Sequence, residues 1–130
     1  MKYKFEKKSL YSRKMVKKMI KAPNPEKIGG TWSTGYATYN ECIFIFVNIG
    51  SAGRTGHDYN NVLKDDMLYW YGKTTHQIQT KSIQDLINGE YEVYIFTRND
   101  SNDTNFIFQG LGSVVDYKAS IPVHITWKLV

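Results

Sequence analysis

Hydrophobic residues recur along this chain with two different periods, and the period changes near residue 29. Between Leu10 and Ile20 the apolar residues return at the spacing of an amphipathic helix. Ser9 is a suitable N-cap for this helix, and Pro23 and Pro25 prevent its continuation. The apolar side of the helix would consist of Leu10, Met15, Val16, Met19 and Ile20, and the opposite side of Lys14, Lys17, Lys18 and Lys21.

From residue 31 onward the spacing becomes that of extended strands. Aromatic and small polar residues alternate over residues 31–39, and residues 42–49 are almost all β-branched or aromatic. Asn40 and Glu41 between them are typical of a tight turn, so the two segments predict a β-hairpin. Further strands are predicted at residues 68–71, 92–97, 106–108, 114–117 and 121–129.

A short helix is predicted between two of these strands. Ser82 and Asp85 have the spacing of a capping box, and Gly89 is placed to end the helix. The lack of alternating strand-helix-strand units argues against a doubly wound fold. We therefore predict an α+β fold: a small, strongly bent, mostly antiparallel β-barrel with an N-terminal basic helix and one short helix over an opening. Gly110 and Gly112 mark a place where such a sheet would bend.

The composition fits one globular domain. The chain has 130 residues, of which 42% are hydrophobic and 15% aromatic, far more aromatic residues than a disordered chain contains. The longest uncharged apolar run, residues 42–47, is too short to cross a membrane, and the basic N-terminus lacks the apolar segment of a secretory signal. The single cysteine, Cys42, cannot form an intramolecular disulfide. We expect a cytoplasmic protein that does not bind membranes.

Charge is distributed unevenly along the chain. Residues 1–28 contain ten Lys or Arg and two Glu, a net charge of +8, whereas residues 29–130 contain seven against ten Asp or Glu, a net charge of −3. We therefore divide the chain into a basic N-terminal helix and linker, residues 1–28, and a barrel domain, residues 29–130. Clustered cations favour binding to the phosphate backbone of a nucleic acid. The candidate phosphate contacts are Arg13, Lys14, Lys17 and Lys18. The alternative is a solvated lysine face on a helix that packs against the domain.

The glycine-rich segment between residues 50 and 61 is the most unusual stretch of the sequence. Its glycines permit close backbone approach, and loops held by a rigid sheet commonly carry function. The segment contains side chains that can recognise a nucleobase by hydrogen bonds, charge or stacking. They are Arg54, His57, Asp58, Tyr59 and Asn60. The alternative is a tight connection in which the histidine and the aspartate bond each other and the backbone.

Aromatic residues form the second candidate cluster. Trp32 and Tyr36 lie in the predicted hairpin, and strand alternation places Trp70 on the face opposite Tyr69 and Tyr71. One set can line a pocket for a flipped base while the other packs, because every nucleobase offers a face for stacking. The alternative is a hydrophobic core that contains Trp70.

Catalytic chemistry has weaker candidates. The three histidines and the one cysteine are too widely spaced for a familiar zinc set, and we expect neither a metal nor another cofactor. Asp65 and Asp66, with His57, are the candidates for a small metal-dependent nuclease. Aspartates between a loop and a strand commonly make turn and capping hydrogen bonds instead. The sequence therefore favours a chain without catalytic activity of its own.

Six stretches of the sequence resemble motifs of a known family. They are residues 32–36 (WSTGY), 43–50 (IFIFVNIG), 53–60 (GRTGHDYN), 68–73 (LYWYGK), 93–98 (VYIFTR) and 106–110 (FIFQG). Together they resemble the PUA-like domains that are appended to bacterial restriction endonucleases and restriction-associated helicases, over about residues 29–129.

The resemblance implies a small barrel of the PUA, SRA and EVE superfamily, whose members hold nucleic acid and often admit one flipped or modified base into an aromatic pocket. It implies recognition roles for Arg54, His57, Asp58, Tyr59, Trp70 and Lys73, and for Arg98 at the edge of the same site. The predicted partner is DNA, with a nuclease or helicase domain as a further partner. We thus predict the DNA-binding specificity module of a restriction or defence system. An RNA-binding module of the same superfamily, a small nuclease and a protein-interaction module are the alternatives.

Overall fold

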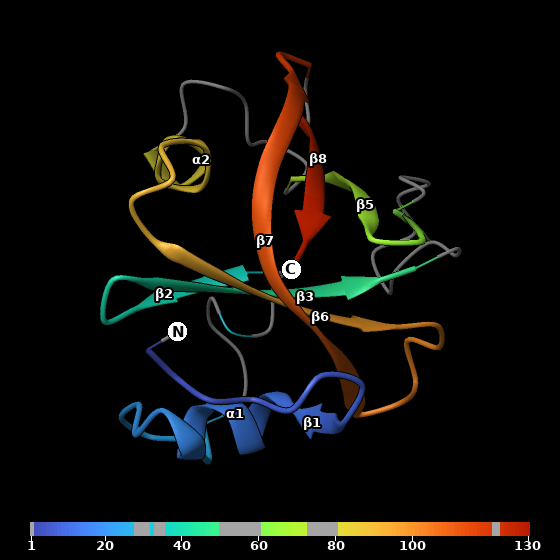
Figure 1. Ribbon diagram of the computed structural model, residues 1–130. Coiled ribbons are helices and arrows are strands. Elements are labelled where there is room, and N and C mark those ends of the chain that lie inside the picture. Colours follow the sequence, from blue (N-terminus) through green and yellow to red (C-terminus); the bar gives the residue numbers. More distant parts are fainter. Residues whose placement is uncertain (1, 28–31, 33–35, 50–60, 73–80, 121–122) are drawn as a thin grey trace.

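The computed structural model describes residues 2–27, 32, 36–49, 61–72, 81–120 and 123–130 (Figure 1). Within these ranges the elements are β1 (Leu10–Ser12), α1 (Arg13–Met19), β2 (Tyr36–Tyr39), β3 (Cys42–Asn48), β4 (Val62–Lys64), β5 (Met67–Tyr71), α2 (Lys81–Ile87), β6 (Glu92–Arg98), β7 (Asn105–Lys118) and β8 (His124–Leu129). The part of the chain that the structure describes contains no helix long and apolar enough to span a membrane.

One mixed sheet contains these strands. They follow the order β2-β3-β6-β7-β8-β5-β4, and β1 pairs with β7 beside this path. The pair β3 and β6 is parallel, and the other pairs are antiparallel. The predicted bent, mostly antiparallel sheet with few helices is confirmed. The closed barrel is not confirmed, because among the described strands β2 and β4 lie at the two ends of the order.

The strand β7 is long and bent, and it belongs to both halves of the sheet. Its first part pairs with β1 and β6, and residues 112–118 pair with β8. In Figure 1 it rises from the bottom of the molecule beside β1 to the top beside β8. The sequence predicted two strands joined at residues 110–112, and the structure corrects this to one strand that bends there. A Cβ added at Gly112 would lie 2.4 Å from Ile95 Cδ1 and 2.9 Å from Trp127 Cε3, so the packing at this position has no room for a side chain.

The N-terminal helix begins later than predicted. Residues 10–12 form β1 instead, paired with residues 105–107 of β7. Ser12, not Ser9, caps α1, because its Oγ accepts a hydrogen bond from the Met15 N–H at 3.1 Å. The predicted cap was wrong because pairing with β7 holds residues 10–12 in an extended conformation, and local sequence patterns do not reveal so distant a contact.

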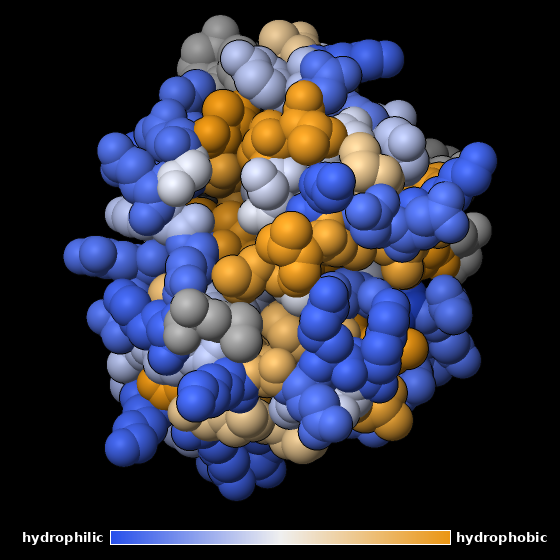
Figure 2. Space-filling model, viewed as in Figure 1, coloured by the Kyte–Doolittle hydropathy of each residue, from blue (hydrophilic) through white to orange (hydrophobic). Residues whose placement is uncertain are grey.

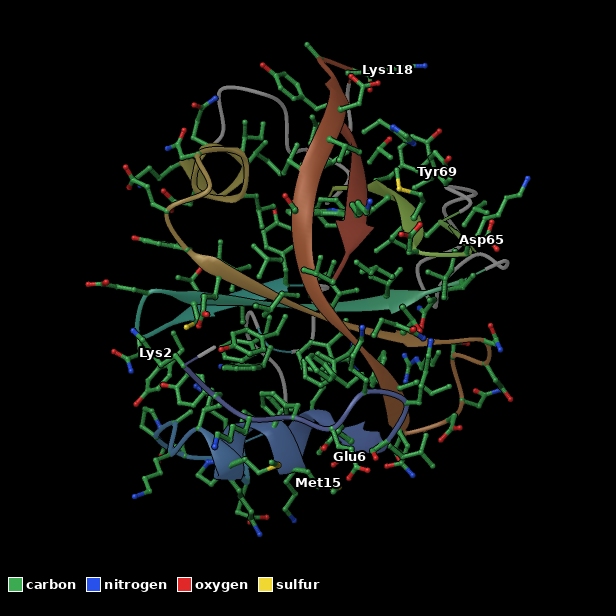
Figure 3. All side chains as sticks on the ribbon, in the orientation of Figure 1. Lys2, Glu6, Met15, Asp65, Tyr69 and Lys118 are labelled. Atoms are coloured by element: carbon green, nitrogen blue, oxygen red, sulfur yellow. The ribbon has the colours of Figure 1, made fainter. Side chains whose placement is uncertain are left out.

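The buried face of α1 also differs from the prediction. Val16 and Ile20 are buried as expected, and Lys17 is buried with them. Three apolar residues that were predicted to face the protein are exposed instead: Leu10, Met15 and Met19. Figure 3 shows Met15 on the outer side of the helix. With seven residues, α1 makes about two turns and presents only a narrow stripe to the sheet.

Two hairpin turns hold residues other than glycine at positive φ. Asn40 and Glu41 join β2 to β3 with φ of 51° and 60°, as a type I′ turn requires, and they confirm the predicted hairpin. Asp65, with φ of 55°, lies in the turn between β4 and β5. The sequence did not predict β4, because three residues beside a turn are too few to show an alternating pattern.

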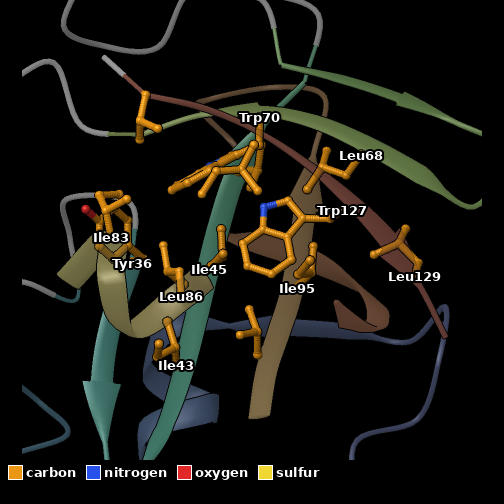
Figure 4. Close-up of a cluster of buried hydrophobic side chains, with 14 residues drawn as sticks. Tyr36, Ile43, Ile45, Leu68, Trp70, Ile83, Leu86, Ile95, Trp127 and Leu129 are labelled. Carbon is orange, nitrogen blue, oxygen red and sulfur yellow. The ribbon is translucent and has the colours of Figure 1, made fainter. Parts of the chain in front are cut away.

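Buried side chains on the two faces of β3 and β6 form two separate cores. The first core consists of Tyr36, Ile43, Ile45, Val47, Leu68, Trp70, Ile83, Leu86, Val93, Ile95, Val123, Ile125, Trp127 and Leu129 (Figure 4). The second core consists of Phe5, Tyr11, Val16, Ile20, Ala22, Cys42, Phe44, Phe46, Tyr94, Phe96, Phe106 and Phe108. Strand alternation explains the division, because successive side chains of a strand point to opposite faces.

The N-terminal segment supplies part of the second core. Phe5 packs against Tyr94, Phe96 and Phe108 with ring centroids between 5.3 and 5.6 Å apart. The Lys8 N–H donates to the Phe108 carbonyl oxygen at 2.8 Å, which fixes the chain beside β7. The described residues before position 28 therefore pack as a layer on the same sheet.

A part-buried polar network fastens the first residues of this layer. Glu92 Oε1 accepts hydrogen bonds from the Lys2 N–H at 2.6 Å and from the Tyr94 hydroxyl at 2.8 Å. The Tyr94 hydroxyl in turn accepts one from the Tyr3 N–H at 2.9 Å. Burial raises the pKa of Tyr94, and the neighbouring Glu92 raises it further, so the phenol stays protonated and donates.

Apolar side chains are also exposed on the surface over β7. Figure 2 shows hydrophobic residues gathered along the middle of this face, with hydrophilic residues on both sides. Val115 and Val130 are 51% and 64% exposed. A cavity of about 180 Å³ lies between α2 and the sheet, lined by residues of α2, β6, β7 and β8, among them Leu86, Val93, Val114 and Trp127.

The variant Gly110→Ala is expected to destabilise this fold severely. Gly110 has φ of +115°, and an added Cβ would lie 2.3 Å from the Val130 carbonyl oxygen, which is backbone and pairs with β7. We expect the free energy of unfolding to fall by about 3 kcal/mol or more in urea denaturation followed by circular dichroism.

Gly89→Ala is the matched control for this substitution. Gly89 has φ of +73°, but no atom lies within 4 Å of the added Cβ, so only backbone strain is introduced. The expected loss is about 1 kcal/mol. Equal losses in the two variants would contradict a steric role for the contact with Val130.

Candidate functional site

Part of the predicted site lies outside the described residues: Arg54, His57, Asp58, Tyr59, Asn60 and Lys73. The structure does describe the residues from which these segments extend. Asn48 ends β3, Asn61 precedes β4, and Tyr71 ends β5. These three residues form the frame of the candidate site.

Arg98 anchors one side of this frame. It pairs with Asn48 in the parallel register, and its carbonyl accepts from the Ile49 N–H at 2.9 Å. Its Nε donates to Asn48 Oδ1 at 2.6 Å, and its Nη1 donates to the Asp103 carbonyl oxygen. The guanidinium lies over Phe106, with Cζ 4.3 Å from the ring centroid, and only 9% of the residue is exposed. A guanidinium that is stacked and hydrogen-bonded in this way has a fixed orientation.

Asn61 connects strand ends from the two halves of the sheet. Its Nδ2 donates to the Asn48 carbonyl oxygen at 3.3 Å, and its Oδ1 accepts from the Tyr71 N–H at 2.9 Å. One amide side chain therefore uses its donor on the end of β3 and its acceptor on the end of β5. Asn48 and Asn61, on either side of residues 49–60, and Tyr71 at the end of β5 are therefore joined by hydrogen bonds.

The predicted aromatic residues lie in two different cores. Tyr36 and Trp70 are in the first core, each 3% exposed, and their rings meet edge to face at 5.5 Å. Trp70 also packs at 6.4 Å against Trp127, whose Nε1 is buried without a hydrogen-bond partner among the described residues. Trp32 packs instead on Phe44 at 5.4 Å, beside the second core. Trp70 is therefore part of a hydrophobic core, which was the alternative interpretation of its position in the sequence. Trp32 is not part of this core.

Two of the predicted phosphate contacts are engaged within the protein. Arg13 Cζ lies 4.9 Å from the centroid of the Phe106 ring. Lys17 is 7% exposed, and its Nζ donates to the Lys27 carbonyl oxygen at 2.9 Å. The hydrogen bond of Lys17 therefore holds the chain that follows α1 against the helix. The sequence had placed Lys17 on the solvent-facing side of the helix, and the structure corrects this.

Lys14 and Lys18 are exposed, and both pair with Glu26. Lys14 forms a salt bridge with Oε2 of Glu26, and Lys18 Nζ lies 3.1 Å from Oε1. Hydrogen bonds from these two ammonium groups lower the pKa of the Glu26 carboxyl. Glu26 therefore offsets part of the positive charge on the outer side of α1.

The family model described as a domain of unknown function, DUF3427, matches residues 5–130 of this sequence. The chain belongs to the DUF3427 family. The match includes β1 and α1, in agreement with their packing in the second core. No curated protein matches the sequence significantly.

Solved structures share the fold of this DUF3427 chain at low sequence identity. The SRA domain of SUVH5 in complex with hemimethylated CG DNA has a TM-score of 0.60 and 15% identity, and the match covers 95% of this chain and 86% of that chain. The SUVH5 SRA complex with methylated CHH DNA has a TM-score of 0.56 and 17% identity, with 96% and 88% covered. Arabidopsis thaliana SUVH6 in complex with SAM has a TM-score of 0.56 and 15% identity, with 97% and 26% covered. The fold is therefore SRA-like, as the resemblance to the PUA, SRA and EVE superfamily implied.

The nuclease candidates Asp65 and Asp66 are exposed in the turn between β4 and β5. The Asp66 carbonyl oxygen accepts from the Leu129 N–H at 2.7 Å, and its carboxylate lies 4.0 Å from Lys128 Nζ. Their expected partner His57 lies outside the described residues. Within the described ranges, no three His, Cys, Asp or Glu side chains are grouped so that they could hold a metal ion.

The sequence-based prediction did not include Asn48 and Asn61. A signal for them was present, because each asparagine flanks the glycine-rich segment next to a strand. Asparagine is favoured at such positions because its side chain can bond to backbone groups. Only the tertiary structure shows which backbone groups Asn61 bonds, namely those at the ends of β3 and β5.

His124 begins β8 beside Tyr71, the last residue of β5. The two rings meet edge to face with centroids 4.6 Å apart. Burial lowers the pKa of His124 and the charge of Lys118 lowers it further, whereas Asp116 acts in the opposite direction. The fold therefore favours the neutral imidazole.

Acidification is expected to destabilise the protein through His124. Because the pKa of His124 is lower in the folded protein than in the unfolded chain, its stabilising contribution is fully present above about pH 6.5 and is lost as the pH falls toward the folded pKa. The variant His124→Gln should lose less unfolding free energy than the wild type between about pH 7.5 and 5.5, measured by urea denaturation. An identical loss in both proteins would contradict this assignment.

Proposed function

We propose that this chain is a DNA-binding module that recognises a modified base in duplex DNA and serves a restriction or defence system. One observation carries the proposal: the fold covers 86% of the SUVH5 SRA domain in its complex with hemimethylated CG DNA. Other SUVH5 SRA complexes contain methylated CHH DNA and fully hydroxymethylated CG DNA. The restriction context rests on the resemblance to PUA-like domains of bacterial restriction endonucleases and helicases.

The hydrogen-bonded frame supports a recognition role for the glycine-rich segment. Residues 50–60 extend from Asn48 and Asn61, and Lys73 follows Tyr71 of the same frame by two residues. We assign stacking on the base to Tyr59. Polar contacts to the base edges or the neighbouring phosphate are assigned to Arg54, His57, Asp58, Asn60 and Lys73.

The buried members of the predicted set receive supporting roles. Tyr36 and Trp70 are almost fully buried in the first core, and a ring must expose one face before a base can stack on it. We therefore assign both to packing under the site, and Arg98 to holding the end of β3. Trp32 lies beside the second core, and we assign it to packing there.

The exposed lysines of α1 suit contact with the DNA backbone. We propose that Lys14 and Lys18 contribute affinity that does not depend on base identity, because phosphate contacts position a protein without specifying sequence. Arg13 lies in the same helix beside Phe106, and Lys17 is engaged by the Lys27 carbonyl. A separate nuclease or helicase domain would act on the DNA that this module selects.

Fluorescence anisotropy with short labelled duplexes tests this function. We expect the wild-type chain to bind a duplex with 5-methylcytosine, 5-hydroxymethylcytosine or N6-methyladenine about tenfold more tightly than the unmodified duplex. Arg54→Ala should weaken binding to the preferred duplex by about 1–3 kcal/mol and reduce that preference, the size expected for a lost base contact of arginine.

Other outcomes of the same titrations would favour another function. Tighter binding of single-stranded or structured RNA than of any duplex would favour the RNA-binding alternative. Magnesium-dependent cleavage that disappears in Asp66→Ala would favour the nuclease. Absence of binding to every duplex at low salt would overturn the proposal.

The variant Glu26→Gln is expected to strengthen DNA binding. It removes the carboxylate that pairs with Lys14 and Lys18, so both ammonium groups become available to phosphates. We expect about a two- to threefold lower Kd at low salt and a steeper dependence of affinity on salt concentration. Salt titrations by anisotropy measure both effects.

Glu6→Gln serves as the control for Glu26→Gln. Glu6 is another exposed carboxylate of the basic N-terminal segment, and the substitution changes the net charge equally. An equal gain in affinity from both variants would show a general charge effect and contradict the release of Lys14 and Lys18.

A further inference from the structure

The second half of the sheet has an outer face that no described element covers. The strands β7, β8, β5 and β4 are neighbours in the sheet, and their inner face belongs to the first core. Burial alternates along β5: Leu68 and Trp70 are buried in this core, whereas Tyr69 between them is 37% exposed. Figure 3 shows Tyr69 and Lys118 on the outer side of β5 and β7, away from α2.

Three aromatic side chains lie together on this outer face. Tyr69 and Tyr71 are two residues apart on β5, so they project from the same face about 7 Å apart along the strand. His124 of β8 pairs with Tyr71, and the two rings meet edge to face at 4.6 Å. Val62 of β4 pairs with Tyr69 on its other side and is 43% exposed. The aromatic group therefore spans two neighbouring strands.

Lysines lie at both ends of this aromatic group. Lys64 of β4 and Lys128 of β8 pair with Met67 on either side, two residues before Tyr69 on β5. At the other end, Lys118 of β7 pairs with the histidine of β8. Residues that pair directly across antiparallel strands project to the same face, so all three lysines belong to the outer face.

Carboxylates offset only part of this positive charge. Asp116 of β7 is on the same face, and the Asp66 carboxylate lies 4.0 Å from Lys128 Nζ. Among the described residues, neither Lys64 nor Lys118 forms an ion pair. Both of these ammonium groups can therefore meet a phosphate.

Aromatic rings between lysines on a sheet face suit a single-stranded nucleic acid. Rings on such a face stack on bases, and the cations beside them bind the phosphates. In a duplex, neighbouring base pairs cover the faces of each base, so a ring on a sheet cannot stack on a base that stays in the helix. A single strand exposes these faces.

We propose that the outer face of β4, β5, β8 and β7 binds single-stranded DNA. Bases stack on Tyr69 and on the pair of Tyr71 and His124. Lys64 and Lys118 contact the phosphates at the two ends of the aromatic group. This site goes beyond the proposed function, which concerns duplex DNA and the segment 50–60.

Fluorescence anisotropy with a labelled oligothymidylate of about 12 nucleotides tests the site. The wild-type chain should bind it saturably at low salt. Tyr69→Ala should weaken binding about tenfold, whereas Tyr69→Phe should bind as the wild type does because it keeps the ring. Tyr117→Ala is the matched control, since Tyr117 is 47% exposed but pairs with Ile125 of the first core, on the opposite face of the same sheet.

Salt titrations test the phosphate contacts separately. Lys64→Ala should reduce the slope of log K against log salt concentration by about 0.7, the value for one phosphate contact on a single strand. Lys81→Ala, at an exposed lysine of α2, is the control and should keep the wild-type slope. An equal change in both variants would show a general charge effect and contradict the assignment of Lys64.

The remaining outcomes decide between this site and other functions. Failure of the wild type to bind oligothymidylate, wild-type affinity in Tyr69→Ala, or an equal loss in Tyr117→Ala would overturn the proposal. Tighter binding of oligouridylate would overturn the assignment to DNA and favour the RNA-binding alternative. Tyr69→Ala should keep the wild-type ratio of Kd values for unmodified and modified duplexes. A wild-type chain that binds oligothymidylate but prefers no modified duplex would refute the proposed function and leave this site intact.

Discussion

The parallel pair of β3 and β6 buries side chains on both of its faces, and the rest of the architecture depends on this constraint. Ile43 and Ile45 point to one side, whereas Phe44 and Phe46 point to the other and stack on rings of β6 at 5.0 Å. A sheet buried on both faces needs two covering layers. The bent strand β7 brings β8, β5 and β4 over the first face, where α2 also packs. The N-terminal segment with β1 and α1 covers the second face.

The same bend separates the two strands that flank the glycine-rich segment, β3 and β4. Because β7 carries the second half of the sheet away from β3, the chain between β3 and β4 must pass from one half to the other. Among the described residues, Asn61 links the two halves by hydrogen bonds to the Asn48 carbonyl oxygen and from the Tyr71 N–H, beside the first core that β3 and β5 share. Loops held by a rigid sheet commonly carry function.

The N-terminal segment contributes both buried apolar side chains and exposed positive charge. Its aromatic and aliphatic residues, such as Phe5 and Val16, complete the second core. Its exposed lysines remain on the outer side of α1, where Glu26 offsets two of them. Lys17 shows that net charge alone overstates the cations available to a partner, because its ammonium is bonded to a carbonyl inside the protein.

Local sequence patterns determined the elements whose conformation depends on neighbouring residues. The turn at Asn40 and Glu41, the strand at 92–98 and the helix that ends before Gly89 follow from local alternation and turn chemistry. The asparagines beside the glycine-rich segment were equally visible, yet their partners were not. Only the tertiary structure decided that residues 10–12 pair with β7, that β7 bends without breaking, that Trp70 enters the core and that Asn61 joins β3 to β5. These outcomes depend on contacts between residues far apart in the chain, and a local pattern carries no information about which distant partner such a residue meets.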